Sequence, residues 1–330
     1  MPIRLGDQIV VVTGASSGIG RATAQAFARR GATLVLAARG VAGLEAAALE
    51  CRELGGRALV VTTDVGDEAQ MRRLADRAMR LFGRIDVWIN GAAVGLYGRI
   101  EEVPGEAVRQ VIQTNLLGTL FGTRIALPIF REQGRGVLIN IASVEGCVGQ
   151  PYSSIYAASK WAVRGVGECL RMEVADAPGI SVCTVLPGAV DTPLFQHAAN
   201  YTGRAVQPLG RPLAAVRVAE EIVAVAGSPR RNAFIGADGI GLLLAAKQLA
   251  PGLVERGVAA RVERNRFLDR PVPRSAGNLT QPLPGAVGGG WRRAAARRRG
   301  GGRLLLPLAV AALVAVPLGL LVWRQSRARA

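Results

Sequence analysis

A tyrosine and a lysine stand four residues apart in the segment YAASK, as Tyr156 and Lys160. In a helix, side chains at i and i+4 share a face, so the ammonium would lie beside the phenol. A free phenol has a pKa of about 10, and a nearby positive charge lowers it towards neutrality. Of the 41 lysines and arginines in the chain, only Lys160 and Lys247 are lysine. A compact three-donor charge at this place predicts a proton-transferring tyrosine, with a lysine that also holds ribose hydroxyls.

A glycine-rich turn, TGASSGIG at residues 13–20, joins an apolar run to a helical pattern. Gly14, Gly18 and Gly20 let the backbone turn tightly and approach a pyrophosphate, while the helix N-terminus offers free N–H groups. Any tight turn between a strand and a helix favours glycine. Because this turn lies in the first βα unit, where dinucleotide sites are built, it predicts nucleotide binding.

The second apolar run ends in Ala38 and Arg39. NAD sites usually carry an acidic residue here, which binds the ribose 2′-hydroxyl. The chain has no carboxylate to repel a 2′-phosphate, and a guanidinium is available to pair with it. The alternative is a solvated arginine in an arginine-rich chain. We therefore expect NADP as cofactor, with NAD less favoured.

The elements that must position these residues alternate between apolar runs and helical patterns. Runs without polar alternation are typical of parallel strands covered on both faces. We expect an α/β fold with a Rossmann-type doubly wound parallel sheet, in one catalytic domain at residues 1–250. The expected strands lie at 8–14, 32–39, 58–65, 85–93, 136–143, 180–188 and 232–236, and the main helices at 21–31, 41–56, 67–83, 105–134 and 156–176.

Other site chemistries find little support in the composition. The single histidine, His197, is read as a solvated loop residue, which argues against a Ser-His-Asp hydrolase or a His-ligated metal centre. The four cysteines are scattered without a CxxC pair, which fits a reducing compartment. We expect no metal.

The motifs together resemble the short-chain dehydrogenase/reductase family over roughly residues 5–240. The resemblance implies a hydride transfer between NAD(P) and a carbonyl or alcohol. It rests on TGxxxGxG at 13–20, DV at 64–65, NGAA at 90–93, NLLG at 115–118, Ser143, YxxxK at 156–160 and PGAVDT at 187–192.

The resemblance also implies roles for single residues. Tyr156 is expected to be the acid/base, Lys160 its activator and ribose clamp, and Ser143 the donor that orients the carbonyl. Asn115 is expected to anchor a water of a proton relay. The implied cofactor-binding residues are Gly14, Ser16, Ser17, Gly18, Ile19, Gly20, Arg39, Asp64, Val65, Asn90, Ala92, Tyr156, Lys160, Pro187, Gly188, Val190 and Thr192.

One segment departs from the family pattern, which is NNAG where this chain has NGAA. Asn90 is kept, Gly91 stands in place of asparagine, and Ala93 in place of glycine. All the substitutes are small, so we expect the cofactor to approach normally, with some loss of polar support in the central sheet.

The substrate is expected to lie under residues 193–213, which include Leu194, Phe195 and Tyr201. Leu96 and Tyr97 are further candidates for the pocket wall. These apolar walls indicate a lipophilic carbonyl or secondary alcohol as substrate.

Beyond residue 250 the sequence changes character. Residues 251–303 read as a C-terminal extension, with a short basic helix near 252–267, and a Pro/Gly/Arg-rich linker. Residues 304–323 contain no charged residue and are long enough to cross a bilayer as a transmembrane helix. A short basic tail follows at 324–330. Ten arginines beyond residue 270 account for ten of the seventeen net positive charges, which leaves +7 for the rest.

The sequence as a whole predicts a membrane-anchored, NADP-dependent oxidoreductase with one spanning segment and its catalytic domain on the cytoplasmic side. Membrane lipids are the expected partners of the basic flank. Nucleic-acid binding is disfavoured because the arginines adjoin an apolar segment and lack interleaved aromatic residues. The alternative is a non-catalytic NADP-binding scaffold or sensor at the membrane. Whether the chain forms a homo-oligomer is left open.

Overall fold

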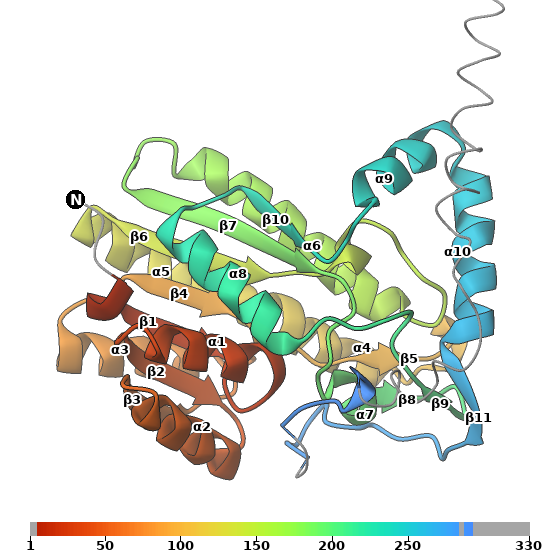
Figure 1. Cartoon of the computed structure of the whole chain (residues 1–330), viewed down its shortest axis with the longest axis horizontal. Coiled ribbons are helices and arrows are strands. Elements are labelled where there is room, and N and C mark those ends of the chain that lie inside the picture. The colour runs from red at the N-terminus through yellow and green to blue at the C-terminus, as the bar shows by residue number, and fades with distance from the viewer. Residues whose placement is uncertain (1–4, 284–286, 293–330) are drawn as a thin grey trace, which may run out of the picture.

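A parallel sheet of seven strands forms the centre of the computed structural model, which describes residues 5–283 and 287–292 (Figure 1). The strand order is β3-β2-β1-β4-β6-β7-β10. Chain progression reverses between β1 and β4, the switch point at which α/β sheets bind ligands. The predicted Rossmann-type sheet is confirmed. Its strands are β1 (Ile9–Thr13), β2 (Thr33–Ala38), β3 (Arg57–Thr62), β4 (Val87–Asn90), β6 (Gly136–Ile141), β7 (Ile180–Pro187) and β10 (Asn232–Ile235).

Helices cover both faces of the sheet, which is why its central strands are apolar throughout. All five residues of β1 are buried. Val10 and Val12 belong to one hydrophobic cluster and Val11 to the cluster on the opposite face. One layer contains α1 (Gly18–Ala28), α2 (Val41–Glu53) and α8 (Ala215–Gly227); the other contains α3 (Glu68–Phe82), α5 (Gly118–Gln133) and α6 (Ser154–Glu173).

Local sequence signals set the ends of these helices, as α3 illustrates. The Asp67 carboxylate accepts hydrogen bonds from the backbone N–H groups of Ala69 and Gln70, which caps the first turn. Gly83 ends the helix with φ of 70°, a left-handed conformation that glycine adopts without strain. Between these caps, the buried positions repeat at helical spacing and face the sheet: Met71, Leu74, Ala75 and Ala78.

The helical pattern predicted at 105–134 is interrupted. A π-helical turn at Gln113–Leu117 separates α4 (Gly105–Ile112) from α5. Such turns are rare in proteins, and those that occur often lie at functional sites. This turn carries Asn115.

Smaller elements gather at the carboxyl end of the sheet (Figure 1). Two short pairings lie outside the central sheet: β5 (Leu96–Tyr97) with β8 (Ala199–Asn200), and β9 (Arg204–Val206) with β11 (Phe267–Pro271). The remaining elements are η1 (Leu5–Asp7), which precedes β1 at the opposite end of the sheet, and η2 (Ile100–Glu102), η4 (Val144–Gly146), α7 (Leu194–His197), α9 (Ile240–Leu249) and α10 (Pro251–Asn265).

The C-terminal extension packs on the domain. The expected basic helix is α10, and its Val262 is fully buried. Residues 272–283 form no helix or strand, as predicted, yet they are held to the domain. Ser275 exchanges backbone hydrogen bonds of 2.9 and 3.0 Å with Asn200, and the Asn278 N–H donates to the His197 carbonyl at 2.8 Å.

Within the described residues, no helix is long and apolar enough to cross a membrane. The predicted transmembrane segment at 304–323 and the tail at 324–330 lie outside the described residues.

Candidate active site

The first two turns of α6 carry Tyr156 and Lys160 on one face. The Lys160 ammonium lies 5.7 Å from the centre of the Tyr156 ring. It donates a hydrogen bond of 2.9 Å to the carbonyl of Ile141, at the end of β6. Only 3% of Lys160 is exposed, and burial lowers the pKa of its ammonium to about 8. The predicted pair is therefore assembled at the carboxyl edge of the sheet.

Ser143 follows the same strand and lies against the Tyr156 hydroxyl, with which it forms a hydrogen bond. Burial raises the pKa of Tyr156 above its ordinary value, and Glu145 and Tyr97 raise it further. The Ser143 hydrogen bond and the charge of Arg266 act in the opposite direction. In the cofactor-free protein the phenol is consequently held in its protonated form.

Asn115 is fully buried beneath this cluster, on the π-helical turn. Its amide accepts from the Val94 N–H at 2.8 Å and donates to the Val94 carbonyl at 3.0 Å. It also donates to Ser159 Oγ at 3.1 Å, on α6. Asn115 is not among the residues that line the cavity described next. Its visible effect is to tie α6 to the segment after β4.

A cavity of about 760 Å³ connects the glycine-rich turn to Tyr156 and continues past it to Phe195. This volume lies within the range of ligand and cofactor pockets. The predicted cofactor residues that line it are Gly14, Ser16, Ser17, Gly18, Ile19, Gly20, Arg39, Asp64, Val65, Ala92, Tyr156, Lys160, Pro187, Gly188, Val190 and Thr192.

The glycine-rich turn leaves room that side chains would fill. Gly14 has φ of 73°, and a Cβ there would lie 2.8 Å from the Ala92 Cα. Gly18 has φ of 55°, and a Cβ on Gly20 would collide with the carbonyl of Gly14. This cradle at the start of α1 fits the pyrophosphate of a dinucleotide.

Asn90 is the one predicted cofactor residue that lies outside the cavity lining. It is buried inside the sheet, where it accepts from Trp88 Nε1 at 2.8 Å and donates to Asn140 Oδ1 at 2.9 Å. Asn140 Nδ2 is buried with no hydrogen-bond partner among the described residues. That orphaned amide lies beside Asn90 and Gly91, where the sequence departs from the family pattern and a loss of polar support was expected.

Arg39 meets the C-terminal extension at the adenosine end of the cavity. Its guanidinium donates to the carbonyls of Leu279 at 2.7 Å and Asn278 at 2.6 Å. These bonds use two of its five N–H donors. No sequence pattern predicts this contact, because any residue can supply a backbone carbonyl.

The same extension continues along the cavity mouth as a strap, defined here as residues 277–283 and 287–291. The carbonyl of Val287 accepts from the Gly18 N–H at 3.2 Å. Asp191 accepts from the Trp291 N–H at 2.8 Å, and the Trp291 ring meets Phe195 edge to face at 6.0 Å. The strap thus covers the turn that would bind phosphate.

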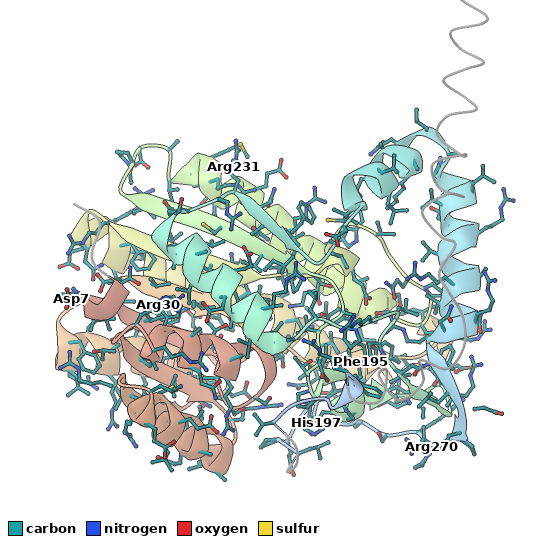
Figure 2. The ribbon with its side chains drawn as sticks, viewed as in Figure 1. Asp7, Arg30, Phe195, His197, Arg231 and Arg270 are labelled. Atoms are coloured by element: carbon teal, nitrogen blue, oxygen red, sulfur yellow. The ribbon has the colours of Figure 1, made fainter. Side chains whose placement is uncertain are left out.

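The wall beyond Tyr156 differs in part from the prediction. Tyr97, Leu194 and Phe195 line the cavity as expected, whereas Leu96 and Tyr201 do not. His197 was expected to be solvated, but it lies on α7 against the cavity, where partial burial lowers its pKa. Phe195 and His197 lie far from Asp7 and Arg30, at the carboxyl end of the sheet (Figure 2).

Sequence reasoning missed several charged residues of the cavity, and Glu145 and Arg266 are the two that lie near Tyr156. Glu145 lines it from η4, two residues after Ser143, and Arg266 lines it from the end of α10. The position of Glu145 between Ser143 and Tyr156 could have drawn attention. Arg266 carries no distinguishing signal among 39 arginines. No cluster of metal-ligating side chains occurs in the described part of the chain.

Comparison with known proteins agrees with this arrangement. Residues 8–201 match the family model described as short chain dehydrogenase. The uncharacterized oxidoreductase YxnA of Bacillus subtilis is 37% identical over 277 residues, which cover 81% of this chain and 76% of that protein.

Two solved structures are similar in fold. An alcohol dehydrogenase of Thermococcus sibiricus, complexed with 5-hydroxy-NADP, has a TM-score of 0.61 and 28% identity, over 69% of this chain and 94% of that one. A short chain dehydrogenase/reductase of Burkholderia phymatum, in complex with NAD, has a TM-score of 0.68 and 25% identity, over 82% and 100%. The extent of these matches and the shared fold show that the chain belongs to the short-chain dehydrogenase/reductase family and is an oxidoreductase of that class.

Proposed function

We propose that the protein is a membrane-tethered, NADP-preferring oxidoreductase that reduces a lipophilic carbonyl compound to a secondary alcohol, or catalyses the reverse. The observation that carries the proposal is one continuous cavity. It joins Ser143, Tyr156 and Lys160 to the glycine-rich turn that fits a dinucleotide.

The chemistry follows from the placement of these side chains. NADPH, when bound, supplies the hydride that reduces the carbonyl carbon. Ser143 Oγ donates a hydrogen bond to the carbonyl oxygen, and Tyr156 Oη gives that oxygen its proton. The Lys160 ammonium stabilises the resulting phenolate, which regains a proton from solvent. The raised pKa of Tyr156 before cofactor binds suits a proton donor.

Two features support a lipophilic substrate and a membrane location. The cavity wall beyond Tyr156 is largely apolar, with Tyr97, Val148, Phe195, Leu209, Leu243 and Val258. The uncharged run at 304–323 is flanked by arginines on both sides, with the denser group before it. The side with more positive charge usually stays cytoplasmic, and this tendency supports the proposal that the catalytic domain faces the cytoplasm.

The test of this function is NADPH oxidation by the full-length protein against a panel of lipophilic ketones. Tyr156→Phe keeps the ring and removes the proton donor. It should retain NADPH binding and lose turnover by about 10²–10⁴-fold, the usual size of acid–base catalysis. Turnover near that of the unsubstituted protein in the Phe variant would remove Tyr156 from the mechanism.

The two solved relatives do not indicate a cofactor preference, because one is complexed with an NADP analogue and the other with NAD. The proposed NADP preference therefore rests on Ala38 and Arg39. Beyond its two bonds to the strap, the Arg39 fork has further N–H donors for a 2′-phosphate. Hydrogen bonds to charged groups contribute about 1.5–3 kcal/mol. The double variant Ala38→Asp, Arg39→Ser should therefore lose at least about tenfold of its preference for NADPH over NADH in kcat/KM. Equal use of both cofactors by the unsubstituted protein would contradict the proposal.

A further inference from the structure

Glu145 places a carboxylate inside the active site. It is the second residue of η4, two positions after Ser143, and its N–H donates to Ser143 Oγ at 3.1 Å. Its side chain accepts from Ser153 Oγ at 2.6 Å and is 12% exposed. Burial raises the pKa of Glu145, while Arg266 and the Ser153 hydrogen bond lower it. Above that pKa, its negative charge opposes ionisation of Tyr156.

Arg266 brings a cation to the same place from the other end of the chain. It is 3% exposed, and its Nη2 lies 3.8 Å from Glu145 Oε1. Hydrogen bonds to Gln150 Oε1 at 2.5 Å and to the Gln207 carbonyl at 3.2 Å fix the guanidinium.

The same guanidinium also contacts the aromatic wall of the cavity. It lies 5.3 Å from the centre of the Tyr97 ring and 5.8 Å from that of Phe195. Contacts of this length between guanidinium and ring faces are favourable. Arg266 is thus a buried part of the cavity wall, held by contacts with the rings of Tyr97 and Phe195.

The charges around Tyr156 come from each element packed against it. Lys160 lies on α6, Glu145 on η4, Tyr97 on β5 and Arg266 after α10. His197 of α7 and Arg261 of α10 also line the cavity. Burial lowers the pKa of Lys160 to about 8. The Arg266 guanidinium lies 3.8 Å from the Glu145 carboxylate and offsets its charge.

We propose that Arg266 is a positioning residue of the active site: it offsets the charge of Glu145 across the substrate cavity and so sets how readily Tyr156 exchanges its proton. The inference rests on Tyr156 being the acid/base of the proposed function. It assigns a part of the reaction to a residue that lies outside the 8–201 region matched by the family model.

The test is a double-mutant cycle of Arg266→Met, Glu145→Gln and the pair, measured as kcat/KM for alcohol oxidation from about pH 6 to about pH 10. Oxidation needs the phenolate, so its acidic limb reports the ionisation of Tyr156. Arg266→Met should move that limb upward by about one to two pH units. At a fixed pH on the limb, kcat/KM should fall about tenfold for each unit of this shift. Glu145→Gln should move it downward, and the pair should return it close to its original position.

Matched controls separate charge from packing. Arg264→Met removes an exposed arginine of α10, whose Nε donates to the Ala260 carbonyl, and should leave the limb in place. Arg266→Lys keeps a charge without the fork, and should raise KM more than it moves the limb. Cofactor binding and thermal unfolding verify the fold of each variant.

Three outcomes would overturn the proposal. The acidic limb could stay in place in Arg266→Met, or it could stay in place in Glu145→Gln. In the double variant, the limb could remain as far displaced as in Arg266→Met alone. If Arg266→Met does not fold, an unmoved limb in Glu145→Gln still overturns the proposal. Tyr156→Phe is measured in parallel. If it stays active, the proposed role of Tyr156 fails; if it is inactive while the limbs stay fixed, only the role of Arg266 fails.

Discussion

Burial of the Lys160 ammonium makes the active site a source of instability in the cofactor-free protein. The folded pKa of about 8 lies below the ordinary value of about 10.4. Below pH 8 both the folded and the unfolded chain hold this proton, and the folded chain bears the full cost of a buried charge. Between the two values only the unfolded chain holds it, so this contribution to the free energy of unfolding rises with pH. Above both values the contribution is constant.

Lys160→Met removes that cation and should stabilise the cofactor-free protein at pH 7 by on the order of 1–3 kcal/mol, while abolishing most turnover. Loss of the bond to the Ile141 carbonyl offsets part of the gain. Thermal unfolding of both proteins from about pH 7 to about pH 10 measures the difference, which should shrink as pH rises. Lys247→Met, at the only other lysine, is the control. A difference independent of pH would show that burial of charge is not its cause.

At the scale of elements, close contacts between helices and the sheet depend on single glycines. Gly122 lies where α5 crosses β4, and it is buried. A Cβ there would overlap Asn90 Oδ1 and lie 2.8 Å from Trp88 Nε1. These are the atoms of the hydrogen bond that joins Trp88 to Asn90 within β4. Gly122 therefore leaves the room that the hydrogen bond between Trp88 and Asn90 needs in the interior of the protein.

Gly122→Ala should destabilise the protein by about 1–3 kcal/mol, because the helix must move away from the sheet. Gly165 on α6 is the matched control, since a Cβ there meets nothing within 4 Å. Gly165→Ala should stabilise by about 0.5–1 kcal/mol, the helix-propensity difference between the two residues. Urea unfolding of the two variants should give shifts of opposite sign. Shifts of the same sign would contradict the packing argument.

An element could be predicted from the sequence where its packing demands a recognisable pattern of residue types. Strands buried on both faces must be apolar throughout, so β1 and β2 stand out as runs such as IVVVT and TLVLAA. The π-helical turn at Gln113–Leu117 was not predicted, because one extra residue per turn leaves no mark on composition. Tyr156 and Lys160 were placed together correctly, since helical spacing alone brings them to one face.

At the scale of the whole molecule, the C-terminal extension is where prediction from the sequence ends. The linker from about residue 271 was expected to lie outside the catalytic fold, but it supplies the strap at the cavity mouth, and the helix before it supplies Arg266. The contacts of the strap at Arg39 and Gly18 are made by backbone carbonyls. A Pro/Gly-rich segment has no periodicity from which such contacts could be inferred.

The position of the strap constrains how a membrane anchor could be connected. Residues 287–291 lie at the cavity mouth, and the uncharged run proposed as anchor begins at residue 304, so few residues separate the two. At most about 3.5 Å per residue, the intervening 12 residues span about 40 Å when fully extended. An anchor at 304–323 would therefore hold the cavity mouth close to the bilayer, where a lipophilic substrate is concentrated.

Anchoring is tested by comparing the full chain with a chain that ends at Arg303. The run at 304–323 matches the roughly 30 Å hydrocarbon thickness, and each arginine before it contributes about 1 kcal/mol near anionic headgroups. The full chain should stay with membranes after alkaline carbonate, whereas the shortened chain, which keeps the strap and every cavity residue, should be released by carbonate or salt. Both should reduce a water-soluble carbonyl equally, but the full chain should gain activity on a membrane-partitioned ketone once reconstituted in vesicles.

Protease added from the cytoplasmic side should digest the catalytic domain. Release of the full chain by carbonate would exclude a spanning helix, and protection from the protease would reverse the orientation.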